Sequence, residues 1–133
     1  MLRGLTTTTF FADDLDAAKA WYTELFGVEP YFDRTPGYLE YRIGDYQHEF
    51  GILNAAYAPP GARQAQPGGA IIHWHVDDIQ AAFDRLLVLG ATEFDPITER
   101  GPGYVTAAVT DPFGNVLGIM FNQHYLDILG ERK

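Results

Sequence analysis

Two histidines separated by one residue, His73 and His75, are the side chains best suited to chemistry in this sequence. They flank Trp74 in a β-prone run, and alternate side chains of a strand leave it on the same side, about 6.5–7 Å apart at the backbone. Two such imidazoles can share one divalent ion, and a carboxylate such as Glu49 would complete three ligands with open positions. Without a metal, imidazoles can bind a ligand or transfer protons near neutral pH. A purely structural role for the pair is the third interpretation.

The environment of Glu49 decides whether it can join such a site. It precedes an apolar run, Phe50-Gly51-Ile52-Leu53, so its carboxylate either faces solvent at a sheet edge or lies in a cavity. Its neighbour His48 must leave the strand on the other side. Only one of these two side chains can therefore face a ligand, and the sequence leaves open which one.

Hydroxyl and aromatic side chains could complete a binding site. The run Thr6–Thr9 favours a strand, and within it Thr7 and Thr9 would share one side, where their hydroxyls could orient a polar ligand or serve only the strand. Aromatic and soft apolar residues on the later strands could line a small-molecule cavity or simply pack the sheets. Those residues are Tyr38, Tyr41, Tyr46, Phe50, Tyr104 and Met120. An anionic ligand group could meet Arg42 or Arg100.

Composition excludes several classes of protein. The chain has 133 residues and a formal net charge of −9, and its nine basic residues form no run, so binding to nucleic acid is not expected. It contains no cysteine and no serine, which excludes disulfides, thiol chemistry and serine hydrolases. No segment resembles a signal peptide or membrane span. We expect a cytoplasmic protein without a membrane partner.

An internal repeat organises the elements that must position these residues. Residues 12–18 (ADDLDAA) match residues 76–82 (VDDIQAA), and residues 36–39 (PGYL) match residues 102–105 (PGYV) at nearly the same offset. Two matches in the same order indicate duplication of a unit of roughly 55–65 residues.

Each copy is predicted to contain a strand, a helix and three further strands. An aspartate pair ends each first strand and can cap the following helix. Apolar residues then recur at helical spacing until Gly27 in the first copy and Gly90 in the second. The predicted strands cover 6–12, 31–34, 38–43 and 47–53 in the first copy, and 70–76, 93–96, 104–110 and 116–121 in the second, with a hairpin turn at 111–115.

The repeat also sets the domain organisation. We expect a single domain made of half-units 3–57 and 69–122, a Pro/Gly-rich linker at 58–68 and a C-terminal tail at 123–133. Apolar residues of the tail fit a short helix that docks on its own chain or on a second subunit. The sheet edges also invite pairing, so a homodimer is expected.

The tandem units, the Asp-Asp-Leu helix start and the late Asp-Pro-Phe-Gly-Asn hairpin resemble the vicinal oxygen chelate superfamily, which includes glyoxalase I, bleomycin-resistance proteins and extradiol dioxygenases. The resemblance covers residues 3–122 and implies an α+β fold of two tandem βαβββ units whose curled mixed sheets enclose a cavity. It places metal ligands on the first strand of each half, at Thr7 and Ile71, and on the final strand, at Gly118. The fourth position falls on Glu49 or His48. Threonine is a weak ligand, and isoleucine and glycine have no donor side chain.

The leading hypothesis is therefore a small-molecule-binding protein without the usual metal site, which binds or sequesters a metabolite or drug in an aromatic-lined cavity. Its expected ligand-binding residues are Thr7, Thr9, Tyr41, Glu49, His73, His75, Tyr104 and Met120. The first alternative is a metal-dependent lyase, isomerase or dioxygenase that holds Fe, Mn, Ni or Zn at a shifted site made by His73, His75 and Glu49. A metal-free variant would use one histidine as the general base. The second alternative is a structural dimerisation module.

Overall fold

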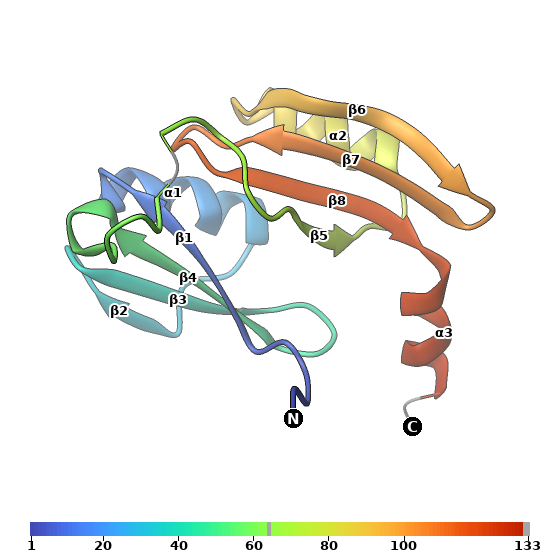
Figure 1. Cartoon of the computed structure of the whole chain (residues 1–133), viewed down its shortest axis with the longest axis horizontal. Coiled ribbons are helices and arrows are strands. Elements are labelled where there is room, and N and C mark those ends of the chain that lie inside the picture. The colour runs from blue at the N-terminus through green and yellow to red at the C-terminus, as the bar shows by residue number, and fades with distance from the viewer. Residues whose placement is uncertain (64, 132–133) are drawn as a thin grey trace. The chain divides into compact units, whose positions relative to one another are not determined.

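The computed structural model describes residues 1–63 and 65–131. The chain divides into two compact units, Met1–Ala65 and Gln66–Lys133, whose elements are labelled in Figure 1. This boundary falls within the expected linker, 58–68. Residue 64 of that linker and residues 132–133 of the expected tail lie outside the described residues.

The first unit is a four-stranded mixed sheet with one long helix. In space its strands follow the order β1, β4, β3, β2; β1 is parallel to β4, and the other neighbours are antiparallel. The elements are β1 (Thr7–Ala12), α1 (Leu15–Phe26), β2 (Phe32–Arg34), β3 (Tyr38–Ile43), β4 (His48–Asn54) and the short 3₁₀ helix η1 (Ala55–Tyr57).

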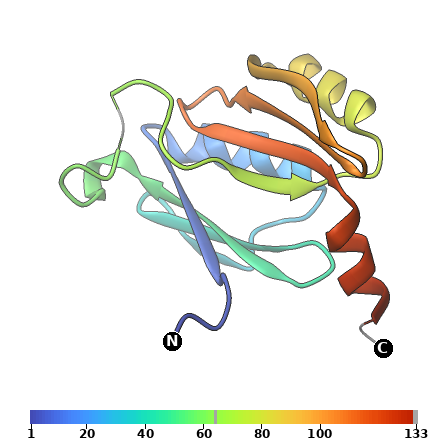
Figure 2. The same cartoon turned by 45° about the vertical axis from the view of Figure 1, so that its right-hand side comes forward.

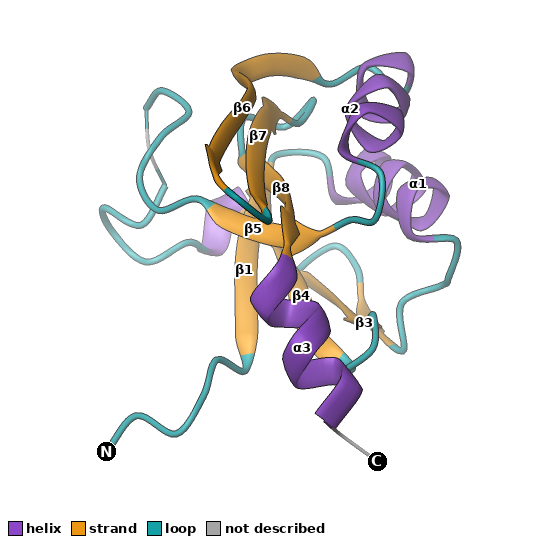
Figure 3. Cartoon of the chain, turned by 90° about the vertical axis from the view of Figure 1, so that its right-hand side faces the viewer, coloured by secondary structure: helices purple, strands orange, loops and turns teal. Residues whose placement is uncertain are grey.

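The second unit repeats this topology. Its strand order is β5, β8, β7, β6, again with a parallel pair, β5 and β8, followed by antiparallel neighbours. A further helix, α3, continues directly from the end of β8 (Figure 2; Figure 3). The elements are β5 (Ile72–His75), α2 (Ile79–Val88), β6 (Thr92–Gly101), β7 (Tyr104–Thr110), β8 (Val116–Asn122) and α3 (Gln123–Glu131). The expected α+β fold of two tandem βαβββ units is confirmed.

Both long helices begin at the residues that the sequence indicates, and α1 also ends there, whereas α2 ends at Val88, before the expected stop at Gly90. The Asp14 side chain accepts a hydrogen bond from the Ala17 N–H at 3.0 Å, and Asp78 accepts one from the Ala81 N–H at the same distance. Gly27 ends α1 in the left-handed conformation, with φ of 72°. Among the described residues, no helix is long and apolar enough to span a bilayer.

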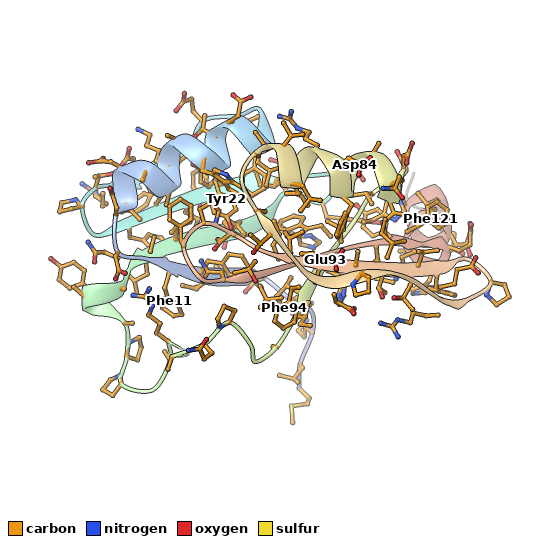
Figure 4. The ribbon with its side chains drawn as sticks, turned by 90° about the horizontal axis from the view of Figure 1, so that it is seen from above. Phe11, Tyr22, Asp84, Glu93, Phe94 and Phe121 are labelled. Atoms are coloured by element: carbon orange, nitrogen blue, oxygen red, sulfur yellow. The ribbon has the colours of Figure 1, made fainter. Side chains whose placement is uncertain are left out.

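Aromatic side chains hold α1 against one face of its sheet. Tyr22 points from α1 toward the strands (Figure 4), and its ring centroid lies 5.0 Å from that of Phe50 on β4. Phe10 of β1 lies 5.0 Å from the same Phe50 ring, and Phe26 of α1 lies 5.3 Å from it. Tyr22 and Phe50 are fully buried. This core covers the face of the sheet that packs against α1, and α1 leaves the opposite face uncovered.

Strand β6 extends further than the sequence indicates. Pro96 suggested that a strand ends there, but β6 continues to Gly101. It is the edge strand of its sheet, and its pairing with β7 shifts register on both sides of Pro96. Proline is tolerated in an edge strand or beside a bulge because no ladder hydrogen bond is lost there.

Asp33 on β2 forms a pH-dependent ion pair with Lys19 of α1. The Thr35 hydroxyl, then Lys19 and the Thr35 N–H, lower the pKa of Asp33 to about 2. A carboxyl with a lowered pKa stabilises the folded state above its unfolded pKa of about 3.9, and this stabilisation is lost as the pH falls toward 2. We expect Asp33→Asn to lower the Tm by about 1–4 °C at pH 7, because the pair is partly exposed, and to lower it progressively less below pH 4. Thermal unfolding followed by circular dichroism checks this; a Tm difference that is independent of pH contradicts it.

Candidate functional site

The side of the first sheet that α1 does not cover is the first candidate surface, which we call the first-unit face. Residues paired across neighbouring strands point to the same side of a sheet. The register pairs Thr7 with Glu49, Glu49 with Arg42, and Gly51 with both Thr9 and Glu40. The residues of the first-unit face by this register are Thr7, Thr9, Phe11, Phe32, Arg34, Tyr38, Glu40, Arg42, Glu49, Gly51 and Leu53.

Glu49, rather than His48, lies on this face. One carboxylate oxygen accepts a hydrogen bond from the Thr7 hydroxyl at 2.9 Å, and the other accepts one from Arg42 Nη2 at 3.3 Å. The Arg42 guanidinium also lies over the Tyr31 ring, 4.1 Å from its centroid. Both oxygens of Glu49 thus have partners within the first unit. His48 leaves β4 on the side of Phe50 and Tyr41, as its pairing with Ile43 shows.

A second carboxylate, which the sequence analysis did not single out, lies beside Glu49. Glu40 accepts a hydrogen bond from the Tyr38 hydroxyl at 2.6 Å. Burial, followed by the charge of Glu49, raises the pKa of Glu40. The same two causes raise the pKa of the Tyr38 phenol, which therefore keeps its proton. Tyr38 and Glu40 form a fixed donor–acceptor pair on the first-unit face.

Tyr38 also fills the space above Gly51. A Cβ atom at position 51 would lie 2.7 Å from Tyr38 Cζ and 2.8 Å from Tyr38 Cε1, closer than real Cβ atoms approach other atoms. Gly51 itself is buried. The ring therefore rests directly on the backbone of β4, where only glycine leaves room for it.

Tyr41, an expected ligand-binding residue, belongs instead to the core. Its side chain is fully buried, and its hydroxyl lies 2.9 Å from Thr23 Oγ1 of α1 and donates to the Lys19 carbonyl at 3.3 Å. It pairs with Phe50 across β3 and β4, so both residues point toward α1. The strand alternation that places Tyr38 on the first-unit face excludes Tyr41 from it.

The corresponding surface of the second sheet, the second-unit face, contains His73. In the repeat, Trp74 corresponds to Phe10, which packs on the helix side, so His73 leaves β5 on the opposite side. Its imidazole is exposed and makes no hydrogen bond within the described part of the chain. Met120 and Tyr104 share this side by register, and Tyr104 is 37% exposed.

Gly118 of β8 lies beneath His73 as Gly51 lies beneath Tyr38. A Cβ atom at position 118 would lie 2.8 Å from His73 Cδ2, from Ile71 Cγ2 and from the Ile72 carbonyl oxygen. Gly118 pairs with His73, and Gly51 pairs with Thr9, the residue that corresponds to His73 in the repeat. The two glycines therefore occupy equivalent positions in the two units.

His75, expected to share a ligand or metal with His73, is used to hold α3. Its Nδ1 accepts a hydrogen bond from the Asn122 N–H at 3.1 Å, so its proton resides on Nε2, which donates to Asp77 Oδ1 at 3.0 Å. The ring stacks on Tyr125 of α3, with centroids 4.8 Å apart and an interplanar angle of 11°. Only 9% of the side chain is exposed. Both ring nitrogens are thus engaged inside the second unit.

Within residues 1–63 and 65–131, no group of three or more His, Cys, Asp or Glu side chains has an arrangement that could hold a metal ion. The structure does bring together Thr7 with Glu49, and His73 with Gly118. Glu40 and Gly51 were not predicted from the sequence. The alternation Tyr38-Leu39-Glu40-Tyr41-Arg42 nevertheless separates a polar side of β3 from an apolar side.

Comparison with known proteins identifies the family. The sequence model of the Glyoxalase/Bleomycin resistance protein/Dioxygenase superfamily matches residues 4–119. The chain belongs to this superfamily. Its curated relatives include "Putative glyoxylase CFP32" of Mycobacterium tuberculosis (strain CDC 1551 / Oshkosh), which is 31% identical over 118 residues, or 84% of this chain and 43% of the relative. The chain thus spans less than half the length of that superfamily member.

Several solved structures share the fold. A glyoxalase-related enzyme from Fulvimarina pelagi aligns with a TM-score of 0.73 and 23% identity over 92% of this chain and 90% of that chain. The fosfomycin resistance protein FosX from Mesorhizobium loti aligns with a TM-score of 0.68 and 17% identity over 96% and 99%. A point mutant of FosX from Listeria monocytogenes, solved with Mn(II) and 1S,2S-dihydroxypropylphosphonic acid, aligns at 0.71 and 16% over 92% of each chain.

Proposed function

We propose that this superfamily member binds a small organic molecule on the sheet faces described above, without the divalent metal site that is common among its relatives. The observation that carries the proposal is the set of residues at the four expected ligand positions. Thr7, Ile71 and Gly118 occupy three of them. The repeat register supports Gly51, not Glu49 or His48, as the fourth, since Gly51 is equivalent to Gly118. One hydroxyl and three residues without donor side chains do not make a metal site.

The space at the two glycines supports the same proposal. The Tyr38 ring fills the position that a ligating side chain at 51 would occupy, and His73 with Ile71 fills it at 118. The residues present therefore do not fit the metal that the family implies. What they offer is hydroxyl and carboxylate groups on the first-unit face and an imidazole on the second-unit face, each able to hydrogen-bond an organic ligand.

A second candidate is a metal-independent enzyme in which His73 acts as a general base. It is favoured by the exposed His73 imidazole, which has no hydrogen-bond partner among the described residues. The shifted metal site of His73, His75 and Glu49 has weaker support, because both ring nitrogens of His75 already have partners. The expected homodimer and cytoplasmic location stay predictions.

Metal analysis tests the proposal directly. We expect protein purified without chelators to contain far less than one equivalent of Fe, Mn, Ni or Zn, and its Tm to be unchanged when these ions are added, since a specifically bound ion stabilises the folded state. Isothermal titration with bleomycin, fosfomycin and lactoylglutathione then tests for binding of an organic ligand without added metal. About one equivalent of metal that is lost in His73→Ala would contradict the proposal. Measurable turnover of a titrated compound that is lost in His73→Ala would favour the enzyme.

A further inference from the structure

The phenol of Tyr38 takes the place of a side chain at position 51. Its ring lies on the Gly51 backbone, and its hydroxyl is held by the 2.6 Å hydrogen bond to Glu40. Glycine below and a carboxylate beside it give the phenol one defined position. At the equivalent position of the second unit, His73 covers Gly118. In both units a polar ring from another strand stands over the glycine.

We propose that Tyr38, seated on Gly51, recognises the ligand of the first-unit face and selects molecules that donate a hydrogen bond to it. This inference rests on the proposed function and names the class of ligand: an organic molecule with an amine, amide or hydroxyl group next to an apolar body. The polar contact is made by an aromatic hydroxyl, where a metal-binding relative would use a coordinating side chain.

The hydrogen bonds already made on this face leave acceptors available. Tyr38 gives its proton to Glu40, so the phenol oxygen can only accept a further hydrogen bond. The other carboxylate oxygen of Glu40 accepts none from the described residues. Two guanidinium groups share this side of the sheet: Arg42 is paired with Glu49 and stacked on Tyr31, and Arg34, which pairs with Tyr38 across β2 and β3, lies over the Phe32 ring, 5.2 Å from its centroid. A donor from the ligand thus meets lone pairs of Tyr38 and Glu40, whereas a ligand of the same shape that only accepts hydrogen bonds gains none there.

Apolar side chains beside Tyr38 fit the body of such a ligand. The Phe32 ring lies 6.3 Å from the Tyr38 ring, between centroids, and is 39% exposed. Phe11 and Leu53, paired across β1 and β4, share the face with Tyr38. An aromatic ring carrying a short donor arm matches this combination.

Nuclear magnetic resonance titration of the intact chain with three probes of one shape tests the inference. Benzylamine and benzyl alcohol donate hydrogen bonds, whereas benzyl methyl ether has the same aromatic body and can only accept them. We expect millimolar benzylamine and benzyl alcohol to shift the amide resonances of Tyr38, Glu40 and Gly51, with benzyl methyl ether at least about 5-fold weaker. Tyr38→Phe keeps a ring on Gly51 but loses the accepting oxygen, so benzylamine should bind about 3- to 10-fold more weakly. Tyr57→Phe, an exposed tyrosine outside this face, is the matched control and should bind as the unsubstituted chain does.

The outcomes separate this inference from the proposed function. If Tyr38→Phe binds benzylamine unchanged, or benzyl methyl ether binds as tightly as the donors, the inference is overturned while small-molecule binding stands. If none of the three probes shifts any resonance of the first-unit face, the inference is overturned. If the compounds of the isothermal titration also fail to bind, the proposed function falls with it.

Discussion

Gly118→Ala is expected to destabilise the protein by about 2–3 kcal/mol, because the added methyl has no free space. Its carbon would lie 2.8 Å from two side-chain atoms and from the Ile72 carbonyl oxygen. That carbonyl belongs to β5, which is paired along its length with β8, so it cannot turn away without breaking the parallel ladder. Urea unfolding followed by circular dichroism measures the change, with Gly4→Ala as a control at a position where nothing lies within 4 Å.

The destabilisation caused by the equivalent substitution in the first unit, Gly51→Ala, should be relieved by a second substitution at Tyr38. The three nearest atoms to a Cβ at Gly51 all belong to the Tyr38 side chain. Gly51→Ala should therefore cost less free energy in a Tyr38→Ala background than in the unsubstituted chain, which a double-mutant cycle detects as coupling. His73→Ala should rescue Gly118→Ala only in part, because Ile71 and the Ile72 carbonyl remain. If Gly118→Ala and Gly51→Ala both match Gly4→Ala, the rings do not fill these positions.

Local signals in the sequence predict the elements well because each is encoded within a few residues. Asp14 and Asp78 cap the two long helices as expected, and the aspartate pairs mark the ends of β1 and β5. The strands 38–43 and 104–110 have the predicted bounds. The repeat adds the order of elements, so the superfamily fold follows from sequence alone. Strand β6 was predicted too short because the tolerance of an edge strand for Pro96 depends on its neighbours.

The site was harder to predict because it depends on which side of each strand faces a helix. Tyr38 and Tyr41 are both aromatic and lie on the same strand, and residue type alone does not separate them. Their neighbours do: Tyr41 alternates with Leu39 and Ile43, whereas Tyr38 alternates with Glu40 and Arg42. Polar partners at two-residue spacing indicate the side that the helix leaves uncovered.

The sequence also contains a pattern that indicates the equivalence of Gly51 and Gly118. Residues 50–53 (FGIL) and 117–120 (LGIM) share an apolar-Gly-Ile-apolar pattern, and aligning them places Gly51 opposite Gly118. The sequence left the fourth position open between Glu49 and His48, because the register of this strand could not be fixed to one residue. The pairing between β1 and β4 connects residues about 42 positions apart, and no local pattern specifies it.

His75→Ala is expected to destabilise the second unit by about 2–3 kcal/mol and to release α3. The substitution leaves the Asn122 N–H without its acceptor, which costs about 1–3 kcal/mol when the group stays buried. It also removes the stack on Tyr125 and the neighbouring Phe121 ring, 5.4 Å away between centroids, each such pair contributing about 0.5–1.5 kcal/mol. Urea unfolding gives the free energy, and hydrogen exchange of the α3 amides reports release of the helix.

The neighbouring histidine provides the matched control for this prediction. His73 is on the same strand but is exposed and makes no hydrogen bond within the described residues, so His73→Ala should leave the stability within about 0.5 kcal/mol and α3 protected. The two substitutions then divide the roles: His75 maintains the fold at the end of β8, and His73 remains available to a ligand. Unchanged exchange of α3 in His75→Ala would contradict the anchoring role and return His75 to the candidate ligand-binding residues. Because an imidazole with both nitrogens engaged has no lone pair left to offer, anchoring by His75 also weakens the case for the shifted metal site.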